Sequence, residues 1–307
     1  MKTSQVRIGT RASQLAQWQA NWVANELRQF GTSTEIVEIA TSGDAQQVGP
    51  IAGIGLQGVF TKEIQAALIN KQVDVAVHSL KDLPTDTPEG LLVAAVPPRE
   101  SPADAFVSNS ASTLDELPAD ACIGTGSQRR AAQLRHMRPD LRVAGLRGNV
   151  DTRLRKLDEG QYDAIVLAAA GLQRLGWEER IRELLGPPRM LPAPGQGALG
   201  LECRLEDTPT RELLAKLDDL HSHQAVNAER SMLALLHAGC SAPVGAWGRI
   251  EGAMLVLDGL VANLTGTQVL RASSRGETAS GEELGRTVAE ELLRQGAEAI
   301  IESARNA

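Results

Sequence analysis

The chain has 307 residues, which is enough for two domains of about 150 residues or for three smaller ones. Hydrophobic residues make up 42% of the sequence and can form a sizeable core, but aromatic residues make up only 3% and offer few rings on which nucleic-acid bases could stack. The formal net charge of -7 also argues against a general binder of polyanions. We therefore expect no nucleic-acid partner.

Hydropathy and cysteine spacing exclude further classes of protein. Residues 1–10 contain no apolar run that could form the core of a signal peptide, and no later segment approaches about 18 consecutive apolar residues. Cys122, Cys203 and Cys240 lie far apart with no CxxC spacing, which disfavours a disulfide framework and a metal site. We expect a cytoplasmic protein with no membrane partner and no bound metal.

The first hundred residues alternate between short apolar runs and amphipathic helical patterns. The expected elements are strands at 5–9, 34–41, 73–77 and 91–96 and helices at 14–30 and 61–70. Ser13 is a good N-cap for the first of these helices. Such alternation is typical of a parallel sheet. Residues 42–58 contain five glycines, and so long a connection predicts a functional cover, the alternatives being a disordered segment or a surface loop with no catalytic part.

A polar, proline-rich link at 97–102 predicts a domain boundary. The elements expected after it are strands at 121–124, 141–144, 163–167 and 198–203, helices at 127–137, 150–159 and up to Arg174, and an extended connection at 190–197. After this point strands and helices no longer alternate. A helix is expected at 221–237, several strands between 244 and 274, and a helix at 282–304, and this order predicts a small α+β domain. The expected domains are 1–98 with 198–217, 102–193, and 220–307.

The most informative stretch runs from Val73 to Pro84 and reads VDVAVHSLKDLP. A buried strand ends there in polar side chains that include Lys81 and Asp82. Ligands in open α/β sheets bind beyond the carboxyl ends of the strands, so this carboxylate beside a lysine is a candidate for chemistry. The alternative is a loop of solvated charges before the proline.

Several arginines follow predicted strands or begin predicted helices. Arg129 and Arg130 follow a glycine turn that opens a helix, where free backbone N–H groups favour an anion. Arg147, Arg153 and Arg174 have similar placements. Because guanidinium groups match carboxylates bidentately, the pattern predicts a small ligand with many carboxylates. The alternative is a set of surface arginines paired with acidic residues.

The three cysteines differ in context. Cys122 and Cys203 lie in apolar strands and are expected to be inert core residues. Cys240 follows a helix end and precedes a Ser-Ala-Pro turn, where a thiol can be reached. It is the one candidate nucleophile or attachment point, although a cysteine in a turn can also be incidental.

Five motifs, in order and spread over essentially the whole chain, resemble the porphobilinogen deaminase (hydroxymethylbilane synthase) family. They are HSLKDLP at 78–84, GTGSQRR at 124–130, LRGNV at 146–150, APGQGA at 193–198 and GCSAP at 239–243. The resemblance implies two α/β domains similar to type II periplasmic binding proteins, with the active site in the cleft between them. A small α+β domain would carry the cofactor cysteine.

The chemistry implied by this resemblance accounts for an arginine cluster in an acidic protein. Four porphobilinogen molecules condense head to tail, with loss of ammonia, into hydroxymethylbilane on a dipyrromethane cofactor bound to Cys240 through a thioether. Positive charge develops on pyrrole nitrogens, and Asp82 would stabilise it as the catalytic residue. The other cofactor-binding residues implied are Lys81, Ser127, Arg129 and Arg130, and the substrate-binding residues implied are Arg11, Ser13, Arg147, Arg153, Arg174 and Gln196.

The chain departs from the family pattern at four positions. Gly53 and Gln57 stand where many relatives have lysines, and Gly126 and Gln128 replace a frequent Ser and Leu. The resemblance therefore does not imply which residues of the 42–58 loop, if any, contact substrate. The alternative function is a two-lobed solute-binding or effector-sensing module for a polycarboxylate. A measured mass of the intact protein above that of the sequence would favour the enzyme over the binding module. The family resemblance also implies a monomer.

Overall fold

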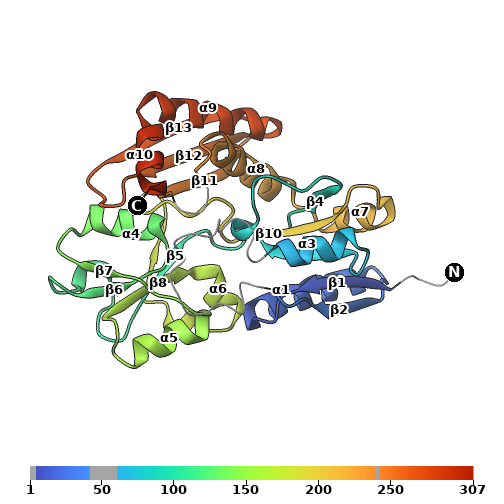
Figure 1. The fold of residues 1–307 in the computed structure, drawn as a ribbon, viewed down its shortest axis with the longest axis horizontal. Coiled ribbons are helices and arrows are strands. Elements are labelled where there is room, and N and C mark those ends of the chain that lie inside the picture. The colour runs from blue at the N-terminus through green and yellow to red at the C-terminus, as the bar shows by residue number, and fades with distance from the viewer. Residues whose placement is uncertain (1–4, 42–60, 239–241, 307) are drawn as a thin grey trace. The chain divides into compact units, whose positions relative to one another are not determined.

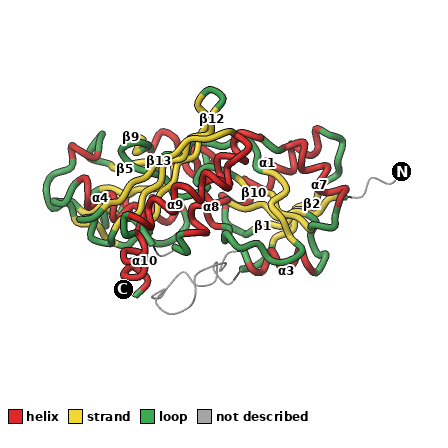
Figure 2. The backbone as a smooth tube through the Cα atoms, turned by 90° about the horizontal axis from the view of Figure 1, so that it is seen from above, coloured by secondary structure: helices red, strands yellow, loops and turns green. Residues whose placement is uncertain are grey.

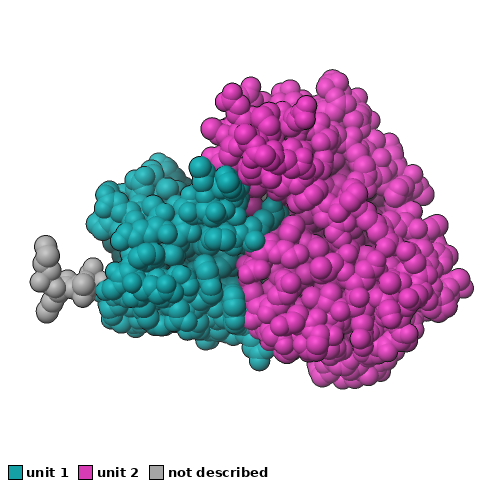
Figure 3. All heavy atoms as spheres, turned by 180° about the vertical axis from the view of Figure 1, so that it is seen from behind, with its two compact units in different colours: residues 1–99, 198–223 teal, residues 100–197, 224–307 magenta. Residues whose placement is uncertain are grey.

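The computed structural model describes residues 5–41, 61–238 and 242–306. The chain divides into two compact units, which Figure 3 colours separately. The first unit comprises residues 1–99 and 198–223, and the second comprises residues 100–197 and 224–307. Each unit has its own hydrophobic core.

The first unit is built on a five-stranded sheet in the order β2-β1-β3-β10-β4. Its strands are β1 (Val6–Thr10), β2 (Thr34–Glu38), β3 (Val75–Ser79), β4 (Leu91–Ala95) and β10 (Leu199–Arg204). The first three run parallel, whereas β10 runs antiparallel to both β3 and β4. Strand β10 comes from a distant part of the chain, and no crossover helix joins it directly to β3 or β4. The connection therefore does not require β10 to run parallel to these strands.

Helices cover both faces of this sheet (Figure 1). The helical elements are α1 (Gln14–Gln29), α3 (Lys62–Ile69), η1 (Leu80–Asp82), α7 (Thr208–Leu214) and η4 (Ala215–Leu217). As predicted, Ser13 caps α1, with its Oγ accepting a hydrogen bond from the backbone N–H of Ala16 at 3.4 Å. Val75 and Val77 pack with α1, and Ala76 points to the opposite face and packs with α3.

The second unit contains a five-stranded sheet in the order β7-β6-β8-β5-β9. Its elements are β5 (Asp104–Ser108), η2 (Leu114–Glu116), β6 (Cys122–Gly124), α4 (Gln128–Met137), β7 (Arg142–Ala144), α5 (Val150–Asp158), β8 (Ala164–Ala168), α6 (Ala169–Arg174), η3 (Glu178–Arg180) and β9 (Glu183–Leu185). Strands β6, β7 and β8 are parallel, and β5 is antiparallel to its neighbours β8 and β9. Leu134 of α4 packs with Ile123 on one face, and Leu154 of α5 packs with Ile165 on the other.

The second unit also contains a three-stranded antiparallel sheet covered by helices (Figure 2). Its elements are α8 (Leu220–Leu235), β11 (Val244–Glu251), β12 (Met254–Ala262), β13 (Val269–Glu277), η5 (Thr278–Ser280), α9 (Gly281–Arg294) and α10 (Ala297–Arg305). Met232 of α8, Leu257 of β12 and Val288 of α9 share its core. Two α/β sheets and a small α+β layer confirm the predicted fold class.

The structure corrects several expected elements. Both large sheets are mixed rather than parallel. Strand β3 starts and ends later than predicted, so His78 and Ser79 lie inside it. Strands β5 and β9 and helix α7 were not predicted. The last helix is two helices, because Gly296 adopts a left-handed conformation with φ of 97° between α9 and α10.

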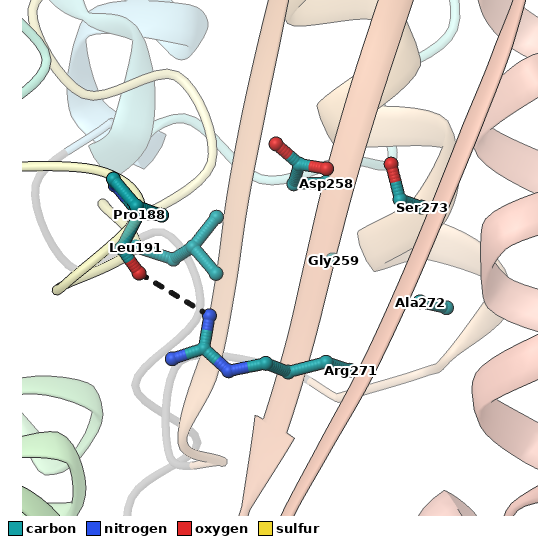
Figure 4. A pocket seen from close by; sticks show the side chains of 7 residues that line it. All are labelled: Pro188, Leu191, Asp258, Gly259, Arg271, Ala272 and Ser273. Carbon is teal, nitrogen blue, oxygen red and sulfur yellow. Dashed lines mark hydrogen bonds between the residues drawn. The ribbon is translucent and has the colours of Figure 1, made fainter.

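A cavity of about 310 Å³ opens beside the three-stranded sheet. Its lining residues are Pro188, Leu191, Asp258, Gly259, Arg271, Ala272 and Ser273. Figure 4 shows Arg271 reaching from β13 toward the carbonyl oxygen of Pro188, to which Nη1 donates at 3.4 Å. None of the site residues predicted above is among these lining residues. Among the described residues, no helix is both long and apolar enough to cross a membrane.

Candidate active site

One edge of the first unit gathers four of the predicted site residues. Arg11 and Ser13 follow β1, whereas Lys81 and Asp82 lie in η1 directly after β3. Strands β1 and β3 pair in parallel, with Ile8 opposite Val75, so their carboxyl ends lie at the same edge of the sheet. Asp82 is exposed at this edge, and Lys81 is half-buried.

Buried contacts fix the strand end that carries Asp82. The backbone N–H of Leu80 donates to Ala198 O at 3.0 Å, which holds the start of η1 against the chain entering β10. His78 Nε2 lies 3.1 Å from Glu202 Oε2, and Gln65 Nε2 donates to the other carboxylate oxygen at 2.9 Å. His78 and Glu202 are both buried, so they belong to the scaffold beneath the site.

A corresponding edge of the second unit gathers the predicted arginines. The loops after β6 and β7 carry Ser127 and Arg147, and these strands are parallel neighbours. Ser127 caps α4, and its Oγ accepts from the Arg130 backbone N–H at 3.4 Å. Arg153 is half-buried, with Nε donating to Gly148 O at 2.7 Å, whereas Arg147 is exposed.

Three of the singled-out residues meet around a carboxylate that the sequence did not point to. Asp104, at the start of β5, has no exposed surface. Its Oδ2 accepts from Arg129 Nη1 at 2.7 Å, and its Oδ1 accepts from Arg130 Nε at 2.9 Å. Gln196 Nε2 donates to the same Oδ1 at 2.8 Å. We call Asp104, Arg129, Arg130 and Gln196 the Asp104 cluster.

The Asp104 cluster holds two guanidinium groups against one carboxylate and so keeps one excess positive charge in a buried place. Burial acts to raise the pKa of Asp104, but the charges of Arg129 and Arg130 outweigh it and lower that pKa far below its usual range. Burial lowers the pKa of Arg129, and Asp104 opposes that effect. Arg129 Nε has no hydrogen-bond partner among the described residues. The cluster therefore suits a further anionic group such as a carboxylate.

Arg174 stands at the end of α6, which follows the neighbouring strand β8. It is 8% exposed, and its Nη2 donates to Gly197 O at 2.7 Å. Burial lowers the pKa of Arg174 to about 10, and the charge of Glu100 counteracts part of this effect. Gly197 has a φ of +87°, and a Cβ there would lie 2.4 Å from Glu100 O, so the turn that receives Arg174 requires glycine.

Sequence reasoning missed Asp104 and the position of Gln196. A single acid before the apolar run AFV is the only local signal for Asp104, which lies just beyond the predicted polar link at 97–102. Gln196 is fully buried, and Nε2 also donates to Pro102 O at 2.7 Å while Oε1 accepts from Arg130 Nη2 at 3.4 Å. Both ends of its amide are thus engaged inside the protein.

Two sequence predictions fall on segments for which no structure is described. Cys240, the expected attachment point, and the expected cover at 42–58 both lie outside the described residues. The other two cysteines are free thiols. Cys203 lies buried in β10, where burial raises the pKa of its thiol to about 11, and Cys122 is half-buried at the start of β6.

The fold defines an α/β protein with two mixed sheets and an added α+β domain. Residues 6–212 match the family described as porphobilinogen deaminase, dipyromethane cofactor binding domain, and residues 223–294 match porphobilinogen deaminase, C-terminal domain. The chain belongs to the porphobilinogen deaminase family. It forms hydroxymethylbilane from porphobilinogen on a dipyrromethane cofactor, as the sequence motifs predicted.

Solved structures of binding proteins are also similar to part of the chain. A nutrient binding protein from Burkholderia cenocepacia bound to methionine is 13% identical, with a TM-score of 0.43, over 69% of this chain and 90% of that chain. A periplasmic substrate-binding protein of an ABC transporter from Coxiella burnetii is 16% identical, with a TM-score of 0.43, over 69% of this chain and 91% of that chain.

Proposed function

We propose that Asp82 is the catalytic carboxylate of this reaction and that the Asp104 cluster holds a carboxylate of the dipyrromethane cofactor. The observation that carries the proposal is the buried excess positive charge of the cluster, together with the unpartnered Nε of Arg129 among the described residues. A buried guanidinium is stabilised by a hydrogen-bonded anion, and acetate and propionate side chains supply such anions. The residues therefore fit the group.

When bound, the cofactor supplies the pyrrole carbon to which porphobilinogen is added, and Cys240 would hold it covalently. Asp82 stands exposed at a strand end whose backbone is fixed by Leu80 and Ala198. A carboxylate placed in this way can stabilise positive charge on a pyrrole nitrogen without moving during the reaction. Lys81 and Ser127 would complete the contacts to the cofactor.

The remaining arginines would hold the carboxylates of incoming substrate. The proposed substrate-binding residues are Arg11, Ser13, Arg147, Arg153 and Arg174. Arg174 is buried with its pKa lowered, so an anion beside it would relieve an electrostatic cost. Gln196, expected to touch substrate, is better placed to orient Asp104, because both ends of its amide bind protein groups.

We further propose a division into three domains, 1–98 with 198–217, 102–193 and 220–307, which agrees with one sheet in each. We also propose a monomer, as the family resemblance implies, and a protein that works in the cytoplasm. Light scattering of the purified protein tests the monomer, and a stable dimer would contradict it.

The test of the site is the mass of the purified chain after expression. Arg129→Leu and Arg130→Leu should reduce the fraction of folded chain that carries the dipyrromethane, because they remove the excess positive charge. Arg155→Leu is the matched control, since Arg155 is an exposed arginine whose Nη1 pairs with Glu159 at 3.1 Å and which lies outside the Asp104 cluster. Full cofactor content in both cluster variants would overturn the assignment of the cluster.

A further inference from the structure

A third fully buried carboxylate, besides Asp104 and Glu202, lies outside the residues discussed so far. Glu229 of α8 has no exposed surface. Its Oε2 accepts from the backbone N–H of Gly195 at 2.6 Å, and its Oε1 accepts from the backbone N–H of Gly248 at 2.7 Å. Each carboxylate oxygen therefore receives a short, charge-assisted hydrogen bond from a different part of the second unit.

The two amides belong to segments far apart in sequence. Gly248 lies in β11, and a Cβ at this position would lie 2.4 Å from Ala225 O, so α8 passes close against the strand. Gly195 lies in the turn of the APGQGA motif, with φ of +74°. The same segment also accepts at Pro192 O from the Ala246 N–H at 2.9 Å. Glu229 thus joins α8, β11 and the turn at one point.

The turn held by Glu229 leads directly into the Asp104 cluster. Gln196 follows Gly195, and its Nε2 donates to Asp104 Oδ1 at 2.8 Å. Asp104 in turn orients Arg129 and Arg130 through four contacts of 2.7 to 3.2 Å. A continuous series of hydrogen bonds therefore runs from α8 through the turn to the buried arginines.

We infer that Glu229 is a positioning residue, which sets the place of Arg129 and Arg130 relative to the domain that carries the cofactor cysteine. The inference rests on the proposed roles of Arg129, Arg130 and Cys240. In this arrangement Glu229 touches neither cofactor nor substrate and acts through Gly195, Gln196 and Asp104.

Glu229→Gln tests this role with little change of volume. The amide can accept only one of the two N–H groups and turns its own NH₂ toward the other. We expect the backbone amides of Gly195 and Gln196 to exchange hydrogen at least about tenfold faster, because a hydrogen bond to a charged acceptor is lost. The fraction of folded, monodisperse chain that carries the dipyrromethane should fall as well, measured by intact mass.

Val288→Ala is the matched control. Val288 lies in the core of the same α+β layer with 1% exposed surface, and its apolar side chain forms none of these hydrogen bonds. It should lower thermal stability while leaving cofactor content and the amide exchange of Gly195 and Gln196 unchanged. If Val288→Ala lost as much cofactor as Glu229→Gln, the effect of Glu229 would be one of general stability, and the inference would be overturned.

A measurement on the wild-type holoenzyme covers the case in which Glu229→Gln does not fold. The amides of Gly195 and Gly248 should rank among the slowest to exchange in the second unit, because both bind a buried carboxylate. Fast exchange of either amide would overturn the inference. So would a folded Glu229→Gln variant with normal cofactor content and normal amide exchange at Gly195 and Gln196. Failure of the proposed function is distinct, since it would appear as normal cofactor content in Arg129→Leu and Arg130→Leu.

Discussion

Arg129 Nη1 and Asp104 Oδ2 lie 2.7 Å apart, and neither side chain has more than 4% of its surface exposed. Arg130 shares the same carboxylate through a contact of 2.8 Å to Oδ1. One acid thus neutralises half of the positive charge of two arginines. In water this pairing would matter little, but in a buried place the missing negative charge favours a further anion, which is why we propose that the two arginines bind one.

The first prediction concerns the stability of the Asp104 cluster. Asp104→Asn leaves two buried guanidinium groups with no counter-charge, and removing one partner of a buried ion pair costs about 3–5 kcal/mol. We expect a loss of this size in the free energy of unfolding, measured by denaturant titration of the second unit's transition. The control is Asp158→Asn, which removes a partly exposed pair with Arg180 and should cost at most about 1 kcal/mol. Similar losses in the two variants would contradict the role given to Asp104.

The second prediction is the pH dependence that follows from the lowered pKa of Asp104. A carboxyl group that binds protons less readily when folded stabilises the protein fully above its unfolded pKa of about 3.9. This stabilisation is lost as the pH falls below that value toward the lower folded pKa. We expect the unfolding free energy of the wild type to decrease more steeply below about pH 4 than that of Asp104→Asn. Parallel curves for the two proteins would exclude a low folded pKa at Asp104.

The third prediction concerns Asp82. Asp82→Asn keeps the size of the side chain and removes its charge, so turnover should fall by at least about 10²-fold, the scale of one electrostatic group in an active site. Cofactor content should remain normal in the folded variant. Asp86→Asn is the control, because Asp86 is exposed in the same loop. If Asp82→Asn turns over within a few-fold of the wild type, Lys81 becomes the better candidate.

Patterns among neighbouring residues in the sequence were sufficient to predict much of the fold and the edge of the candidate site that carries Asp82. The N-cap at Ser13 and the polar end of β3 depend on neighbours in sequence, so the sequence predicted both. The direction of β10 and the partners of Asp104 depend on chain segments far apart. Asp104 meets Arg129 only because β5 enters the sheet antiparallel beside β8, and nothing near Asp104 in the sequence encodes that. Gln196 was singled out by its motif, but its buried position depends on the same packing.

The fourth prediction separates the cysteines. Cys240→Ser should yield chain with the mass of the sequence alone, whereas Cys203→Ser and Cys122→Ser should retain the dipyrromethane. Cys203 is buried, and its raised pKa of about 11 leaves almost no thiolate at neutral pH, so it cannot substitute as the attachment point. Intact mass spectrometry of the three purified variants is the measurement. Cofactor retained in Cys240→Ser would move the attachment point to another residue.

The last prediction is that different arginines serve different steps of chain growth. Arg153 and Arg174 lie outside the Asp104 cluster, on α5 and at the end of α6, so their loss should leave cofactor loading intact. Arg153→Leu and Arg174→Leu should instead stall after one or more additions, because a growing polyanion lacks one of its cationic partners. Mass spectrometry of enzyme mixed with porphobilinogen resolves the intermediates, and Arg155→Leu, on the same helix as Arg153, should give the wild-type series. Different stopping points for Arg153→Leu and Arg174→Leu would assign each arginine to its own ring. Identical series for these two variants and for Arg129→Leu would contradict the division, because the arginines would then act as one undivided field of positive charge.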